Sequence, residues 1–168
     1  MEKYFHIISV LNALVSFAII YTLVRPTLVA AGRKQHLTVL LSVHLFRYLG
    51  LIALLPGLFD LSSLGFTKAY FAQIAYGDFM SGILAIVCLI TLRSNSPITT
   101  PVLWFFNLFG FIDLLNAGIR IAPQIQDPNI LGGLGWIIFT VYLPAVIVSH
   151  IAIFYLLLNP SQSQGKAS

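Results

Sequence analysis

An apolar run from Leu37 to Leu55 carries a permanently charged side chain, Arg47, close to its middle. The run is long enough to cross a lipid bilayer, which takes about 20 predominantly apolar residues. A charge at the bilayer centre costs about 2.5–3.5 kcal/mol on insertion scales, so such a residue faces the interior of a helix bundle and pairs with other groups. Two carboxylates are candidates for this pairing, Asp78 and Asp113, each inside another apolar run. We therefore expect the chain to fold around Arg47.

The composition is typical of an integral membrane protein. Of the 168 residues, 58% are hydrophobic and only 8% are charged, and the mean hydropathy is +0.93. Soluble proteins carry about 25% charged residues. The net charge of +4 comes from scattered basic residues and not from a cluster, so we expect no nucleic-acid partner. The single cysteine, Cys88, excludes an intrachain disulfide and dithiol chemistry.

Five apolar runs predict an all-α, polytopic membrane helix bundle that forms one domain over residues 1–158. The five transmembrane helices are expected at about 4–24, 37–55, 69–92, 101–121 and 136–158. Arg25-Pro26 should end the first helix, which is too long for the core of a signal peptide, and Pro144 should kink the fifth. The segment 58–66 is too short to span and is placed at the membrane surface. Residues 159–168 are expected to form a disordered cytoplasmic tail.

The distribution of basic residues predicts the orientation of the bundle. If the first two helices are joined inside, the inner segments hold five basic residues and no acid, namely Arg25, Arg33, Lys34, Arg93 and Lys166. The outer segments hold Lys3, Lys68 and Arg120 together with Glu2, Asp60 and Asp127. This bias favours an orientation with the amino terminus outside and the carboxy terminus inside.

The polar residues inside the runs fall at two depths. His44 lies eight residues beyond His36, and His150 lies eight residues before Leu158, so both are about 12 Å inside the membrane. Asn107, six residues past Pro101, is close to the same level. These three residues form a predicted inner layer. Arg47, Asp78 and Asp113 form a predicted outer layer about one helical turn away. A stripe of His6, Ser9, Ala13 and Ser16 in the first run should also face other helices.

The outer layer suggests a functional site. A guanidinium has donors enough for two carboxylates, but a second ionised carboxylate is expensive in low dielectric, so one Asp should share or hold a proton. We therefore expect a membrane protein that binds or passes a proton, an ion or a small polar ligand at Arg47, Asp78, Asp113, Asn107, His44 and His150. A purely structural role for the charges, fixing the register of the helices, is the alternative.

Other functions fit the same residues. His44 and His150 could be the axial ligands of a b-type haem in an electron-transfer protein, although two carboxylates would repel its propionates. A metal held by these histidines and the two aspartates is opposed by Arg47, and we predict no metal site; if a metal were bound, a hydrolase acting on lipid would be the enzymatic function. The chain could also be a non-catalytic subunit or assembly factor of a larger membrane complex, or a homo-oligomer. Phosphate-binding and serine-hydrolase motifs are absent, which argues against an enzyme.

The second to fifth runs each carry one short polar pattern. These are His44-x-x-Arg47, Gly77-Asp78, Asn107-x-x-Gly110-x-x-Asp113-Leu114 and a late His150. This pattern resembles small bacterial multi-span membrane proteins of unknown function. The resemblance implies a bacterial inner-membrane setting, and it implies no activity, cofactor or partner.

Overall fold

A computed structural model of the chain describes residues 7, 11, 14–55, 67–121 and 137–159, and every element within them is helical. The expected all-α class is confirmed. The surface segment 58–66, the connection 122–136 and residues 160–168 of the expected tail lie outside the described residues, as do His6, Ser9 and Ala13.

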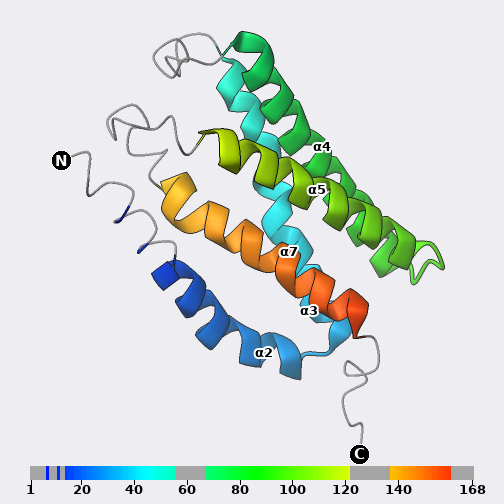
Figure 1. Cartoon of the computed structure of the whole chain (residues 1–168). Helices are drawn as coiled ribbons and strands as arrows, with labels where there is room; N and C mark the ends of the chain where they lie inside the picture. The colour runs from blue at the N-terminus through cyan, green and yellow to red at the C-terminus, as the bar shows by residue number, and fades with distance from the viewer. Residues whose placement is uncertain (1–6, 8–10, 12–13, 56–66, 122–136, 160–168) are drawn as a thin grey trace, which may run out of the picture.

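The helical elements follow one another as η1 (Ile20–Val24), α2 (Arg25–Ala30), α3 (Arg33–Val43), η2 (His44–Leu54), α4 (Lys68–Arg93), α5 (Thr99–Ile121), η5 (Ile138–Tyr142) and α7 (Leu143–Leu158). Three stretches of the described chain are long and apolar enough to cross a membrane: Lys68–Arg93, Thr99–Ile121 and Thr140–Leu158. In Figure 1, α4 and α5 run side by side, η2 lies behind them, and α7 lies between α5 and the N-terminal helix.

Two prolines follow a five-residue π-helix: η1 precedes Pro26, just beyond the first expected span, and η5 precedes Pro144, inside the fifth. The first helix was expected to end at Arg25-Pro26, and this is wrong, because the helix continues to Ala30. A proline lacks the N–H and crowds the carbonyl four residues earlier, and a wide π turn absorbs both defects without ending the helix. For Pro144 that carbonyl belongs to Thr140, and it accepts a hydrogen bond of 2.7 Å from Ser16 Oγ. Ser16, the described polar member of the expected stripe in the first run, therefore contacts η5 at this residue.

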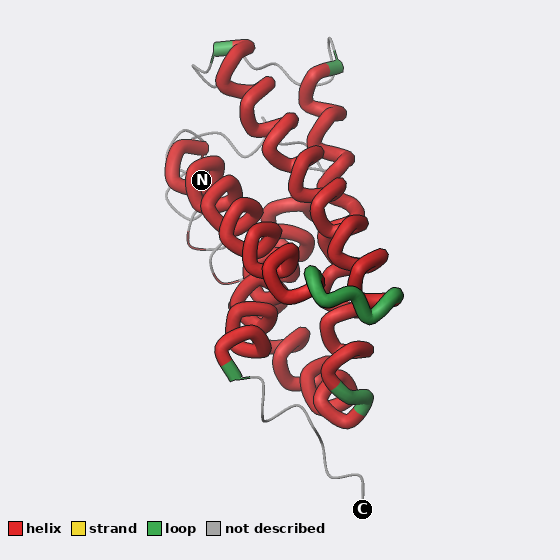
Figure 2. Tube along the Cα trace, turned by 90° about the vertical axis from the view of Figure 1, so that its right-hand side faces the viewer, coloured by secondary structure: helices red, strands yellow, loops and turns green. Residues whose placement is uncertain are grey.

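The packing face of α4 carries mostly small side chains, whereas large apolar side chains face outward. On α4 the buried positions include Ala75, Ser81, Gly82 and Ala85, whereas Ile90 is 62% exposed. The outward face of α5 is equally apolar, since Ile112 is 61% and Ile119 71% exposed. This is the reverse of a soluble bundle, and small inward residues let helix backbones approach closely in membranes. The described helices thus have an apolar outer surface. Figure 2 shows the bundle turned by 90° from the view of Figure 1.

The buried apolar core occupies one end of the bundle. It brings together α3, α4, α5 and α7 through Leu37, Leu40, Leu41, Ala85, Cys88, Leu103, Phe106, Ile153, Leu156 and Leu157. The buried polar side chains around Arg47 come from η2, α4, α5 and α7 and begin at His44, three residues beyond Leu41.

The expected second helix changes its winding at His44. Arg33–Val43 is α-helical, and His44–Leu54 continues as 11 residues of 3₁₀-helix. A 3₁₀-helix has three residues per turn, so side chains at i and i+3 lie in one row. The winding therefore places His44, Arg47 and Gly50 in a row along η2. The first two are buried, while the neighbouring Phe46 and Tyr48 are exposed on other sides.

Candidate functional site

Arg47 is the centre of the buried polar cluster. Its Nε donates to Asp78 Oδ1 at 2.7 Å, and its Nη2 donates to Asp113 Oδ2 at 2.7 Å. Nη1 donates to the carbonyl oxygen of Gly110 at 3.1 Å. The guanidinium side chain is only 1% exposed. One buried cation from η2 is thus held by carboxylates from α4 and α5, as its position in an apolar run predicted.

The two carboxylates are less deeply buried than the guanidinium. The Asp78 side chain is 29% exposed and that of Asp113 is 15% exposed. Each uses one oxygen on Arg47, which leaves the other oxygen of each carboxylate outside these two ion pairs. The cluster therefore has a buried basic side and a partly open acidic side.

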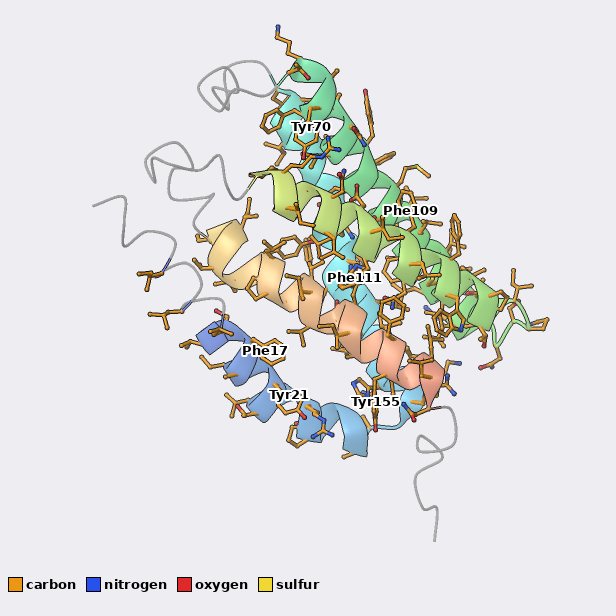
Figure 3. The ribbon with its side chains drawn as sticks, viewed as in Figure 1. Phe17, Tyr21, Tyr70, Phe109, Phe111 and Tyr155 are labelled. Carbon is orange, nitrogen blue, oxygen red and sulfur yellow. The ribbon has the colours of Figure 1, made fainter. Side chains whose placement is uncertain are left out.

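His150 and Asn107 form a reciprocal pair behind the guanidinium. Asn107 Nδ2 donates to the backbone oxygen of His150 at 3.1 Å, so its Oδ1 is left to accept from His150 Nδ1 at 2.7 Å. The proton then lies on Nδ1, and Nε2 presents a lone pair to Arg47 Nη1, 3.4 Å away. Phe111 of α5 lies with its ring 5.8 Å from the His150 ring, between α5 and α7 (Figure 3). The predicted inner and outer layers are therefore connected through Arg47 and His150.

His44 contacts a residue that the sequence analysis did not select, Ser149. Its Nε2 is hydrogen-bonded to Ser149 Oγ, which also contacts the carbonyl oxygen of Val146 at 3.0 Å. The His44 ring lies 4.3 Å from the His150 ring and 4.9 Å from the Phe106 ring. Its Nδ1 is buried without a hydrogen-bond partner among the described residues. A serine next to His150 in an apolar run was the available signal for this contact.

Replacing Ser149 by alanine is expected to destabilise the protein. The substitution removes the partner of His44 Nε2 and leaves a fully buried imidazole unpaired, which costs about 1–2 kcal/mol. Ser42→Ala is the matched control, because within the described part of the chain Ser42 Oγ bonds only to the Val39 carbonyl of its own helix. Thermal unfolding in detergent compares the two variants, and equal unfolding temperatures would contradict a structural role for this hydrogen bond.

Three glycines allow the helices to close around the cluster. A Cβ at Gly50 would lie 2.7 Å from Asp78 Cβ, and a Cβ at Gly110 would lie 2.8 Å from His150 Cε1 and 3.0 Å from Arg47 Nη1. At Gly77 it would overlap the Asp113 carboxylate. These separations are shorter than van der Waals contact, so no larger residue fits at the three positions without moving the charged groups. The glycines are part of the site although they contribute no side chain.

Two tyrosines of η2 and α4 lie apart from the cluster. Tyr48 is 51% and Tyr76 56% exposed, so neither phenol faces the buried charges. Tyr70, near the Lys68 end of α4 (Figure 3), has the guanidinium carbon of Arg120 5.4 Å from its ring centre. This cation–π pair lies at the end of the bundle to which the carboxylates are nearest.

The arrangement does not fit the haem alternative. A porphyrin held by two axial histidines lies between their rings, but the His44 and His150 rings are in edge contact, and both nitrogens of His150 already face Asn107 and Arg47. Within the described part of the chain, no three His, Cys, Asp or Glu side chains form a group that could hold a metal ion. We derive no chemistry through either cofactor.

Comparison with known proteins identifies the family. No curated protein and no solved structure matches the chain. A family model described as "Domain of unknown function (DUF8737)" matches residues 4–158, which include all the helices and every residue of the polar cluster. The chain therefore belongs to this family of unknown function.

Proposed function

We propose that the chain is a five-span integral protein of a bacterial inner membrane. The three long apolar helices and their exposed isoleucines support membrane insertion. The N-terminal helix, and α3 continued by η2, would supply the other two spans. At a rise of 1.5 Å per α-helical and 2.0 Å per 3₁₀ residue, residues 37–54 extend about 32 Å, close to the thickness of the hydrocarbon core.

The proposed orientation puts the amino terminus outside and the carboxy terminus inside. Its support is the grouping of basic residues at one end of the bundle. Lys34 Nζ donates to the Arg93 backbone oxygen at 3.2 Å and to Asn95 Oδ1 at 2.9 Å. The first turn of α3 therefore lies beside the turn that joins α4 to α5. Arg25 and Arg33 belong to the same side, which the positive-inside rule assigns to the cytoplasm.

We infer that the Arg47 cluster binds and releases a proton or a small cation at the pair Asp78–Asp113. One observation carries this proposal: a single buried guanidinium pairs with two carboxylates, each 2.7 Å away. If both carboxylates are ionised, the cluster has one negative charge in excess inside an apolar bundle. Such a charge is costly unless a proton or cation neutralises it, and the two carboxylates, 29% and 15% exposed, are less buried than the guanidinium.

Binding and release at one side fit the geometry better than passage through the bundle. Arg47 separates the carboxylates from His150 and His44, and a guanidinium keeps its proton under all physiological conditions. It therefore cannot relay a proton from the aspartates to the histidines. His150 and Asn107 are instead hydrogen-bonded to each other as neutral groups. They hold the guanidinium in place from the side opposite the carboxylates.

Replacing either aspartate by asparagine tests this proposal. Infrared difference spectra of the protein in nanodiscs, recorded on changing the pH or adding Na⁺ or K⁺, are expected to show a carboxyl band that Asp78→Asn and Asp113→Asn alter or abolish. The amide keeps the side-chain shape and removes the ionisable group. Asp60→Asn, outside the expected spans, is the control and should leave the band unchanged. Spectra in which both cluster variants respond like the wild type would leave the charges with a structural role alone.

A further inference from the structure

The 3₁₀ winding of η2 is unusual for its length and its sequence. Runs of more than three or four 3₁₀ residues are uncommon, because side chains three apart eclipse and the hydrogen bonds are poorly aligned. η2 has 11 residues, from His44 to Leu54, and contains no proline. Leucine, alanine and arginine, which make up much of it, prefer the α-helix. Contacts with the rest of the bundle must therefore hold this winding.

The contacts that hold η2 lie on its single row of side chains. His44 is bonded to Ser149, Arg47 to Asp78 and Asp113, and Gly50 fits against Asp78. In α winding, three residues complete only 300°, so relative to His44 the side chain of Arg47 would turn by about 60° and Gly50 by about 120°. The row would no longer face α4, α5 and α7 at once, and the two ion pairs could not persist together with the His44 contact.

We propose that η2 changes from 3₁₀ to α winding when the pair Asp78–Asp113 takes up a proton or a cation. The inference rests on the proposed function, since it assigns a structural response to the same site. Neutralising a carboxylate weakens its attraction for Arg47, and the local preference for the α-helix then decides the winding. The side chains of Phe46, Tyr48 and Leu49 are exposed and do not block the rotation. At Gly82 of α4 the η2 backbone is in contact with a helix surface that carries no side chain, since a Cβ there would lie 3.4 Å from the Tyr48 backbone nitrogen.

The change in winding shortens the segment by a measurable amount. The rise falls from 2.0 to 1.5 Å per residue, so η2 contracts by about 5 Å over its length. Spin labels on Thr38→Cys and Leu55→Cys, both exposed and on either side of η2, report this distance in a Cys88→Ala background. Labels on Lys68→Cys and Arg93→Cys, at the two exposed ends of α4, report whether the bundle remains intact.

Pulsed electron–electron double resonance on the full chain in nanodiscs measures the two spin-label distances and tests the proposal. With Asp78→Asn and Asp113→Asn combined, the Thr38–Leu55 distance is expected to shorten by about 5 Å, while the α4 distance is unchanged. The wild type should show the same shortening on acidification or on addition of Na⁺ or K⁺. An unchanged Thr38–Leu55 distance in the neutralised variant, with α4 intact, overturns the proposal.

A second comparison separates this inference from the proposed function. If the wild type shows the carboxyl infrared band but keeps its Thr38–Leu55 distance at every pH and cation concentration, ion binding stands and the winding change is refuted. If the neutralised variant shortens but the wild type does not respond, the winding depends on the charges as proposed, and uptake of an ion at the site is contradicted. A neutralised variant that loses the α4 distance is unfolded, and the wild-type titration then decides the outcome.

Discussion

Arg47→Met is expected to destabilise the protein by about 3–5 kcal/mol, because the change leaves two carboxylates without their counter-charge inside the bundle. Methionine retains most of the apolar stem but none of the donors that reach Asp78, Asp113 and the Gly110 carbonyl. The loss should appear as a lower midpoint in unfolding by sodium dodecyl sulfate from mixed micelles. Arg25→Met is the control. The Arg25 side chain is exposed, and its guanidinium carbon lies 5.0 Å from the centre of the Tyr21 ring.

Neutralising both aspartates is expected to restore the stability that Arg47→Met loses in the same assay. In the triple variant Arg47→Met, Asp78→Asn, Asp113→Asn, no unpaired charge remains, and replacing a buried ion-pair group by neutral residues is often close to neutral for stability. The triple variant should therefore recover most of the stability that Arg47→Met loses. A triple variant no more stable than the single one would show that the guanidinium acts through packing and not through its charge.

Gly77→Ala is expected to destabilise the protein by about 1–3 kcal/mol, although alanine is the better helix former. The added Cβ would overlap the Asp113 carboxylate. That carboxylate is pinned 2.7 Å from Arg47 Nη2, so it can move away only by stretching the ion pair. The same unfolding assay measures the loss, and the infrared carboxyl band should shift as Asp113 changes its environment.

Gly118→Ala on α5 is the matched control, because a Cβ there has no atom within 4 Å. Without a steric conflict, the helix preference of alanine should leave the protein unchanged or stabilise it by up to about 1 kcal/mol. Equal effects of the two substitutions would mean that the close approach of α4 and α5 at Gly77 is not maintained in the membrane.

The centre of the site could be predicted from the sequence because burying a charge is costly. Arg47 in an apolar run required acidic partners, and only two runs offered them, so Asp78 and Asp113 were predicted as its partners before any geometry was known. Counting residues from the helix ends also placed His150 and Asn107 at one depth, where they form hydrogen bonds. Helix rise is nearly constant, so depth along a helix can be calculated from sequence position.

The winding, the close contacts and the helix ends could not be predicted in this way. The sequence of η2 favours an α-helix, and its 3₁₀ form depends on partners from three other elements. Ser149 could be assigned to His44 only once the rotation of α7 was known. The helix was expected to stop at Arg25-Pro26, but a π turn continued it, which local propensity does not predict.

An all-helical bundle around Arg47 and two acids follows from residue types alone, because hydrophobicity and the cost of burying a charge act on each residue type wherever it lies. The winding of η2, the carboxylate oxygens that Arg47 binds and the positions that require glycine follow from the folded arrangement. Those features depend on the rotation and spacing of neighbouring helices, which side-chain packing sets and which no single segment encodes.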